Sequence, residues 1–471
     1  MVIYQAESTD KMSRLFLPPV QRSMRVLDRS LFKKTIPTSA ARVFNPRDIS
    51  RVQKECSADL LRIKRVQLMP EDPENKPKKL IVFRPEVKYD DISTASPATQ
   101  GLIHSKVMEL VPYTLHMDYS HWNYDQIINA VLPEDMLDDA PCSFSQAGHL
   151  AHLNLRAPYL PYKSLIAQVI LDKNPKIKTV VNKLEDVGSH SVFRTFPMEI
   201  VAGPADTTVE VKESNCTFIF DFAKVYWNTR LGHEHERIIA KFQPGEAVCD
   251  VMAGVGPFAV PAGKNDVFAW ANDLNPESYS SLCENIKRNK VGAFVRPFNT
   301  DGRAFIRSSI RELYAEHLNP ATNPATVPGQ PFKYSRTKAQ AGIQQLTKAP
   351  DRKIPVPPTF AHFVMNLPAS AIEFLDAFRG AYRGMEHIFA DGKAKMPLIH
   401  VHTFHRELPG RGPEFAREDI LATIKQYLGT EVRDQDLELE DVRRVAPSKV
   451  MYCASFRLPA EAAFADVEIA T

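Results

Sequence analysis

The sequence has no long hydrophobic run, no closely paired cysteines and little net charge. No apolar stretch approaches the roughly 18 residues that a membrane-spanning helix needs, so we expect a soluble protein with no membrane partner. The six cysteines include no CxxC pair, which argues against a zinc ribbon or a disulfide framework and favours a reducing compartment. Lys and Arg number 59 against 56 Asp and Glu, so any nucleic-acid binding must come from local basic patches.

Glycine is also scarce relative to proline, with 19 glycines against 36 prolines. A chain of 471 residues exceeds the usual size of one domain, and the prolines gather where domains or segments meet. We predict three pieces, 1–115, 116–222 and 223–471. Within the last, residues 319–358 hold eight prolines and six Lys or Arg against one acidic residue, which predicts a disordered basic insertion.

The local patterns predict mixed α and β structure before residue 222. Residues 80–85 have the pattern of a short strand, and 102–131 contain two segments with helical apolar spacing. Strand-like runs follow at 151–155, 165–171 and 217–222, which indicates a mixed α/β module. From residue 247, strands and helices alternate around a glycine turn, as in a doubly wound parallel sheet, so we predict a Rossmann-like α/β fold for the last piece.

The glycine turn follows a buried-type strand at 247–252. Asp250 stands at the strand end, and Gly254 and Gly256 allow the backbone to approach a ligand closely beside a helix N-terminus. Taken alone, the turn is equally consistent with a tight strand–helix connection. Its spacing lacks the Gly-x-Gly-x-x-Gly of dinucleotide sites and the Gly-Lys-Ser/Thr of ATP sites, which favours S-adenosylmethionine over NAD or ATP.

Two further acidic residues follow the next strands of this pattern. Asp273 ends the run at 267–271 and can accept hydrogen bonds from ribose hydroxyls, and Asp301 lies where an adenine amino group could reach it. Each acid by itself is better explained as an ordinary solvated helix cap. Their joint spacing with Asp250 indicates one adenosine-containing cofactor.

Several motifs together resemble the archaeal-eukaryotic tRNA (guanine(37)-N1)-methyltransferase family, whose members have a class I methyltransferase domain. The likeness covers roughly residues 110–310 and 360–460, with a shorter match at 18–34. The matching motifs are FDFAKVYWNTRL at 220–231, the Asp250 turn, NDLNPES at 272–278, NLPA at 366–369, HLNLR at 152–156, LDKNP at 171–175, and APS and CASFR at 446–448 and 453–457. The first dozen residues and the 319–358 insertion have no counterpart in the family pattern.

The resemblance implies transfer of a methyl group from S-adenosylmethionine to N1 of guanine 37 in tRNA, by a protein that acts as a monomer. N1 carries a proton, so a base must remove it, and the negative charge that develops on O6 needs a donor. By the resemblance, Glu234 is the general base and Arg194 stabilises O6. Asn366 hydrogen-bonds the guanine edge and contributes to the cofactor site. Tyr226 and Pro368 shape the base pocket, and Arg230 orients Glu234.

Glu234 also has a simpler explanation as part of a solvated helix face at 233–237. As a base it needs a pKa above its usual value of about 4.3, and we expect burial against Tyr226 and Trp227 to provide it. A metal site at His400 and His402, which would share one strand face, is rejected because no carboxylate or cysteine stands at ligand spacing.

The tRNA would have to expose guanine 37 and be held by its phosphates. Basic residues that fit this role are Arg22, Arg25, Arg29, Lys33, Lys34, Lys163, Lys173, Lys176 and Lys178. In the family, the small N-terminal domain contacts the outer corner of the tRNA. The resemblance therefore assigns tRNA contacts to 1–115, and tRNA and active-site contacts to 116–222.

Two alternatives remain open. One is the related wyosine-pathway transferase, which moves the aminocarboxypropyl group of the same cofactor, and the other is a non-catalytic tRNA-binding factor. Residues 1–44 hold eight basic and three acidic residues, which fits a mitochondrial presequence or a basic surface segment equally well. We expect the protein in cytoplasm and nucleus, with a mitochondrial matrix pool if the presequence interpretation holds.

Overall fold

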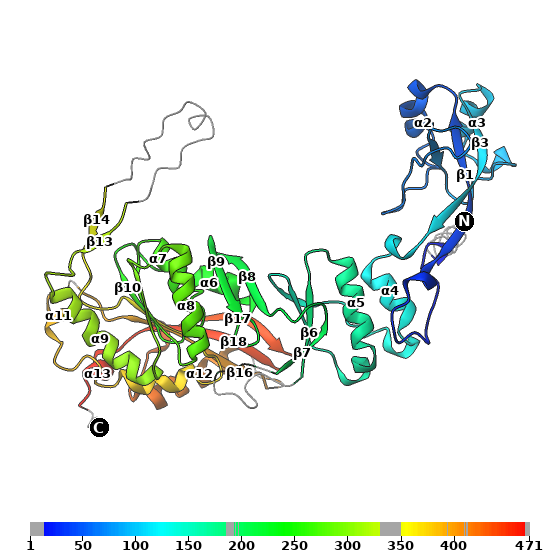
Figure 1. Cartoon of the computed structure of the whole chain (residues 1–471). Coiled ribbons are helices and arrows are strands. Elements are labelled where there is room, and N and C mark those ends of the chain that lie inside the picture. Colours follow the sequence, from blue (N-terminus) through cyan, green and yellow to red (C-terminus); the bar gives the residue numbers. More distant parts are fainter. Residues whose placement is uncertain are drawn as a thin grey trace. The chain divides into compact units, whose positions relative to one another are not determined.

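The computed structural model forms two compact units, each described by itself (Figure 1). The structure describes residues 14–184, 193, 195, 197–329, 350–392, 394–408, 410 and 413–466. Unit 1 comprises Met1–Phe144, Ala151–Asn182 and Glu199–Ala205, and unit 2 comprises Ser145–Leu150, Lys183–Met198 and Asp206–Thr471. No helix in the described ranges is long and apolar enough to cross a membrane.

Unit 1 contains a three-stranded antiparallel sheet in the order β2-β1-β3. Its elements are β1 (Lys34–Val43), α2 (Ile49–Glu55), β2 (Leu80–Val82), α3 (Pro97–His104) and β3 (Met108–Met117). The predicted strand at 80–85 is confirmed. Of the two helical segments predicted within 102–131, one is α4 (Tyr124–Val131), whereas residues 108–117 form β3, which pairs with all ten residues of β1. Because β3 crosses residue 115, the predicted boundary there falls inside a strand.

The rest of unit 1 packs helices against a second sheet. It holds α4 (Tyr124–Val131), β5 (Leu150–Leu153), α5 (Lys163–Lys173), β6 (Thr179–Lys183) and β7 (Met198–Ala202). The predicted strand at 165–171 is wrong, since these residues lie inside α5. A short apolar run has the same composition in a buried helix and a buried strand, and here Leu165, Ile166 and Ile170 are all buried in the unit 1 core.

Unit 2 is built on a seven-stranded sheet in the order β12-β11-β10-β15-β16-β18-β17. The strands are β10 (Ala247–Asp250), β11 (Phe268–Asn272), β12 (Val295–Phe298), β15 (His362–Met365), β16 (Leu398–Arg406), β17 (Glu438–Ala446) and β18 (Lys449–Arg457). The five neighbouring strands β12, β11, β10, β15 and β16 pair in parallel, whereas β18 pairs antiparallel with β16 and β17. This order confirms the predicted doubly wound sheet.

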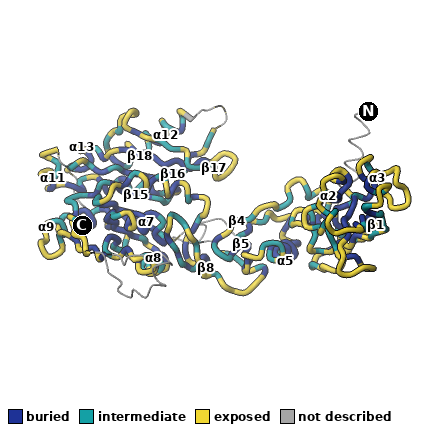
Figure 2. The backbone as a smooth tube through the Cα atoms, turned by 90° about the horizontal axis from the view of Figure 1, so that it is seen from above, coloured by how far each residue is buried: buried dark blue, intermediate teal, exposed yellow. Residues whose placement is uncertain are grey.

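Helices cover both faces of this sheet. They are α6 (Gly232–Ile239), α7 (Ala259–Lys264), α8 (Pro276–Asn289), α9 (Gly302–Leu318), η8 (Ala371–Phe378), α11 (His387–Ala390), α12 (Pro413–Leu428) and α13 (Ala460–Ala463). Helices α7 and α8 contact each other, and η8 contacts both α9 and α12. Figure 2 shows α8 and α12 on opposite sides of buried strands β15 and β16. Asn275 caps α8, and Pro276 is its first residue.

The chain also contains a short strand and several 3-10 helices. They are β4 (Ser145–Ala147), η1 (Arg29–Phe32), η2 (Pro46–Asp48), η3 (Ile92–Thr94), η4 (Tyr119–His121), η5 (Glu134–Met136), η6 (Ala157–Tyr162), η7 (Thr229–Leu231) and η9 (Asp434–Asp436).

A two-stranded ribbon before the large sheet also belongs to unit 2. It consists of β8 (Thr208–Glu213) and β9 (Cys216–Asp221), which the sequence analysis placed in the 116–222 piece. Asn285 and Asn289 on α8 accept hydrogen bonds from the backbone of β9, at 2.8 and 2.9 Å. Through such contacts β8 and β9 belong to unit 2, whose main segment begins at Asp206 and not at the predicted residue 223.

The predicted disordered insertion at 319–358 has structure at both ends. Strands β13 (Ala325–Val327) and β14 (Arg352–Ile354) pair antiparallel, and Arg352 forms an ion pair with Asp266 at 2.6 Å. All eight prolines of this stretch lie outside the sequence ranges of these two strands. Residues 330–349 fall outside the described part of the chain.

Candidate functional site

The glycine turn after β10 has a backbone that only glycine accommodates well. Gly254 has a φ of +56° and Gly256 a φ of +97°. A Cβ at Gly256 would lie 2.7 Å from Val260 Cγ2 and 2.8 Å from Leu282 Cδ1. The turn is therefore packed against α7 and α8 with no room for a side chain at Gly256.

Side chains at the neighbouring strand end hold this turn in place. The Gly254 amide donates to Asp273 Oδ2 at 2.8 Å, and Asp273 Oδ1 accepts from the Asn275 amide at 2.9 Å. Asn272 donates to the carbonyls of Val251 and Thr300, at 3.1 and 3.0 Å. The ends of β10, β11 and β12 thus form one hydrogen-bonded edge.

Asp250 is completely buried at this edge, and neither carboxylate oxygen makes a hydrogen bond of normal geometry with the described residues. Burial raises its pKa to about 8, the nearby Asp273 adds to the rise, and the Ala259 amide offsets only part of it. A buried carboxylate with so little hydrogen bonding favours a ligand that brings a donor. Together with the close backbone approach at the glycines, this fits S-adenosylmethionine, whose amino and sulfonium groups are cationic.

Asp301 acts as the N-cap of α9. Its Oδ1 accepts from the amides of Arg303 and Ala304, at 2.9 and 3.1 Å, and its side chain is exposed. This is the cap explanation that the sequence left open. A contact of Asp301 with adenine remains a prediction.

Glu234 lies on α6 and is buried, with 4% of its surface exposed. Arg237 donates to it from Nε and Nη2, at 2.6 and 2.8 Å, and His402 Nε2 donates to Oε1 at 2.7 Å. Burial alone would raise the pKa of Glu234, but the hydrogen bonds from His402 and Arg237 lower it below its usual value. The predicted raised pKa is therefore wrong in this state, because two cationic partners stabilise the carboxylate.

The hydrogen-bond partners of Glu234 include residues that the sequence did not predict. Trp227 packs against Phe218 and Phe220. Arg230 is exposed, and the side chains that hold Glu234 are Arg237 and His402. Sequence spacing predicts helix neighbours such as Arg237 but cannot identify a residue more than 160 positions away.

The NLPA segment begins directly after β15. Asn366 Oδ1 is buried without a hydrogen-bond partner among the described residues, so its carbonyl is available to a donor. The carbonyl of Pro368 accepts from the Phe404 amide of β16 at 2.9 Å, which fixes the turn to that strand. Arg194, the predicted partner of O6, lies outside the described residues.

Tyr226 and Arg230 lie near a cation that the sequence analysis missed. Arg443 on β17 has its pKa lowered by burial and by the charge of Arg230, with Tyr226 also close enough to influence it. Tyr226 is 40% exposed. Two arginines beside an exposed tyrosine are suited to hold a phosphate next to a base.

His400 and His402 of β16 both contact other side chains of the protein. His400 lies 2.9 Å from His362 and 2.8 Å from Ser455. Ligand atoms of Glu234, His402 and Cys453 all lie within 4.8 Å of one another, a spacing also seen in metal sites. Since Arg237 and His402 already occupy the oxygens of Glu234, we interpret this group as a hydrogen-bonded cluster.

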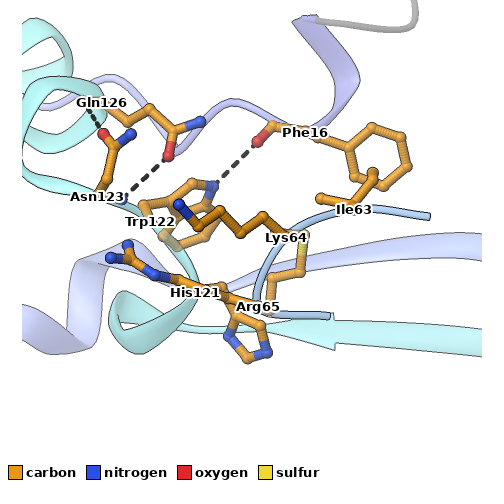
Figure 3. A pocket seen from close by; sticks show the side chains of 9 residues that line it. Phe16, Ile63, Lys64, Arg65, His121, Trp122, Asn123 and Gln126 are labelled. Atoms are coloured by element: carbon orange, nitrogen blue, oxygen red, sulfur yellow. Dashed lines mark hydrogen bonds between the residues drawn. The ribbon is translucent and has the colours of Figure 1, made fainter. Parts of the chain in front are cut away.

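Two cavities lie away from the glycine turn. One in unit 1, of about 180 Å³, is lined by Lys64, Arg65, Trp122 and Asn123 among others, and Figure 3 shows Trp122 donating to the Phe16 carbonyl beside it. The other, of about 790 Å³, is lined by residues at the beginnings of β10, β15 and β16. Cofactors of such sheets bind at the carboxyl ends of the strands, so this second cavity is not the cofactor site.

Six of the predicted phosphate-binding residues have partners inside unit 1. Arg29 pairs with Asp172 and Lys163 with Glu199, and the other four donate to backbone carbonyls, namely Arg22, Arg25, Lys34 and Lys173. Lys33, Lys176 and Lys178 are exposed. Contacts of any of them with tRNA remain a prediction.

The sheet order and the cofactor edge define a class I, S-adenosylmethionine-dependent methyltransferase fold. Residues 208–317 match the model of the TRM5/TYW2 methyltransferase domain, and 124–207 match that of the TYW2 N-terminal domain. Crystal structures with the same fold include Trm5b from Pyrococcus abyssi, at 21% identity over 89% of this chain and 99% of that chain, with a TM-score of 0.54. The complex of aTrm5 and tRNALeu gives 18% identity over 90% and 100%, with a TM-score of 0.56.

Similarity to curated proteins identifies the family. A tRNA (guanine(37)-N(1))-methyltransferase of Aspergillus fumigatus is 48% identical, and the alignment covers 96% of each chain. A protein of the same name in Schizosaccharomyces pombe is 47% identical over 94% of this chain and 96% of its own length. The chain therefore belongs to the tRNA (guanine(37)-N(1))-methyltransferase family.

Proposed function

We propose that this protein transfers the methyl group of S-adenosylmethionine to N1 of guanine 37 in tRNA. The observation that carries the proposal is the 48% identity, over 96% of the chain, to a relative named for this reaction. The matched domain model is shared by TRM5 and TYW2 proteins, but the close relatives are named for N1 methylation. This favours methyl transfer over aminocarboxypropyl transfer.

The cofactor edge is formed by the glycine turn and the strand ends. Gly254 and Gly256 allow close approach, Asp250 offers a buried carboxylate, and Asp273 holds the turn. When bound there, S-adenosylmethionine supplies an electrophilic methyl group on its sulfonium. Asn366, at the end of β15, has a buried carbonyl available to the guanine edge.

Removal of the N1 proton is assigned to Glu234, as the family resemblance implies. Its carboxylate is ionised and held by Arg237 and His402. One hydrogen bond must lengthen as guanine approaches, because a carboxylate bound to two cationic donors is a weak base. Arg237 has a second carboxylate neighbour, Glu438 at 3.5 Å, which offers it an alternative partner.

The test uses the full chain, an unmodified tRNA transcript with guanine 37, and cofactor labelled in either the methyl or the carboxyl group. We expect methyl label alone to enter the RNA, 1-methylguanosine on nucleoside analysis, and a primer-extension stop at position 37. A transcript with adenine 37 is the control. Carboxyl label in the RNA would instead indicate aminocarboxypropyl transfer, and binding without transfer would indicate a non-catalytic factor.

The first mutational prediction concerns Glu234→Gln. This change keeps the size of the side chain but removes its ability to accept the N1 proton. We expect a loss of about 10²-fold or more in the single-turnover rate at saturating tRNA and cofactor. Wild-type single-turnover methylation by Glu234→Gln would contradict the base assignment.

We also propose that the protein acts as a monomer, in cytoplasm and nucleus with a mitochondrial matrix pool. The basic composition of residues 1–44 supports the mitochondrial pool. Light scattering of the purified chain and fractionation of cells that express a tagged chain test these two points.

A further inference from the structure

The carboxylate of Glu234 is held from two different structural elements. Arg237 belongs to the same helix, three residues further along α6, and its guanidinium forms a two-point contact with both oxygens. His402 comes from the centre of β16 and is completely buried. Charge-assisted hydrogen bonds of this length have strong directional preferences, so the two donors define where the carboxylate lies.

The two donors have different effects on position. Arg237 moves with α6, and its contact with the sheet is to Glu438 on the edge strand β17, at 3.5 Å. His402 is part of a strand paired on both edges, with β15 and with β18. Its hydrogen bond therefore fixes the carboxylate relative to the sheet that carries the cofactor edge.

The same strand also holds the NLPA turn. Two residues after His402, the Phe404 amide donates to the Pro368 carbonyl at 2.9 Å. Asn366 lies two residues before Pro368, at the end of β15. Strand β16 is thus the common support of Glu234 and of the segment assigned to the guanine edge.

We propose that His402 is a positioning residue for methyl transfer: it holds the Glu234 carboxylate at a fixed place relative to the Asn366–Pro368 turn. The proposal deepens the proposed function, because it rests on Glu234 being the base. A base displaced by about 1 Å from the proton it accepts can lose on the order of 10²-fold in rate without any loss of binding.

The prediction concerns His402→Gln and His402→Ala. The glutamine amide can still donate a hydrogen bond near the position of Nε2, whereas alanine cannot. We expect the single-turnover rate to fall about 10-fold in His402→Gln and about 100-fold in His402→Ala. We expect the dissociation constants for tRNA and cofactor to stay within about twofold, because the hydrogen bond of His402 is made to Glu234.

The pH profile gives a readout that a purely structural role would not change. In the wild type, hydrogen bonds from His402 and Arg237 lower the pKa of Glu234. The methyl-transfer rate therefore falls only at low pH, where Glu234 becomes protonated; this fall is the acidic limb of the pH profile. Loss of the imidazole lets this pKa rise, and the limb moves to higher pH in both variants. The charged or titratable groups near His402 are Glu234, Cys453, Asp250 and His400, and Arg237 binds the same Glu234 oxygen as His402.

His400→Gln is the matched control. His400 is equally buried on the same strand, but its hydrogen bonds go to His362 and Ser455. We expect this variant to keep both the wild-type rate and the wild-type pH profile. Melting temperatures and cofactor affinities of all three variants show whether they are folded.

The outcomes separate the inference from the function on which it rests. Wild-type rates and an unshifted acidic limb in both His402 variants would overturn the positioning role. An equal loss in His400→Gln and His402→Gln, with lowered melting temperatures, would also overturn it, because the histidines would then be structural. Full activity of Glu234→Gln, or absence of 1-methylguanosine in the wild-type product, would instead refute the base assignment or the proposed function.

Discussion

At the scale of single residues, the cofactor edge contains a destabilising charge. Asp250 is fully buried, and burial raises its pKa from 3.8 to about 8. Since its pKa is higher in the folded than in the unfolded chain, folding takes up a proton between these values. The stability of the cofactor-free protein therefore falls as pH rises from about 4 to about 8 and stays low above that.

This predicts opposite effects of Asp250→Asn on stability and binding. The variant should be more stable than the wild type at pH 9, by up to a few kcal/mol, with little difference near pH 4.5. Cofactor affinity should fall at least tenfold, because the amide cannot neutralise a cationic ligand. Chemical denaturation at pH 4.5, 7 and 9, with calorimetric titration of S-adenosylmethionine, measures both. An Asn variant that is less stable at pH 9 would show that Asp250 has a compensating donor.

At the scale of elements, the turn between β10 and α7 shows what a motif does and does not reveal. Glycine spacing predicted a close backbone approach, and both glycines have positive φ. The side chains of α7 and α8 determine at which of the two glycines there is no room for a Cβ. Val260 and Leu282 close the space at Gly256, whereas nothing lies within 4 Å of a Cβ at Gly254.

We therefore predict unequal effects of two alanine substitutions in this turn. Both Gly254→Ala and Gly256→Ala bear the left-handed backbone cost of about 1–2 kcal/mol. Gly256→Ala must also displace Val260 and Leu282, so we expect an additional loss of about 1–3 kcal/mol and the greater loss of cofactor affinity. Equal unfolding free energies for the two variants would show that the turn can move to relieve the contact.

Other elements show where local patterns were insufficient. The apolar run at 165–171 is inside α5, and β3 lies within the range 102–131 for which two helical segments were predicted. In both cases the tertiary partner against which the apolar residues pack determines whether they form a helix or a strand. The pairing of β3 with β1 joins residues more than 60 positions apart.

At the scale of the whole molecule, the chain consists of two compact units. The division near residue 206 agrees with the meeting point of the two matched family models, at 207 and 208. All proposed cofactor residues belong to unit 2. The predicted tRNA-contacting roles of residues 1–115 and 116–222 remain untested.

This arrangement predicts two thermal transitions with different responses to cofactor. At a concentration about 100 times its dissociation constant, S-adenosylmethionine should stabilise unit 2 by about 2.7 kcal/mol. The transition of unit 1 should not shift. Differential scanning calorimetry with and without cofactor checks this, and a single transition that shifts as a whole would show that the units unfold together.

The sequence by itself determined the parallel sheet, the glycine turn and the acids at the strand ends, because strand–turn–helix patterns and backbone requirements are local properties of the chain. It also carried the family motifs that identify Glu234 and Asn366. Only the tertiary structure decided that His402 and Arg237 hold Glu234, that its pKa is lowered, and that Asp250 is left without a donor. These properties depend on burial and on charges brought together from distant strands, and no local pattern encodes them.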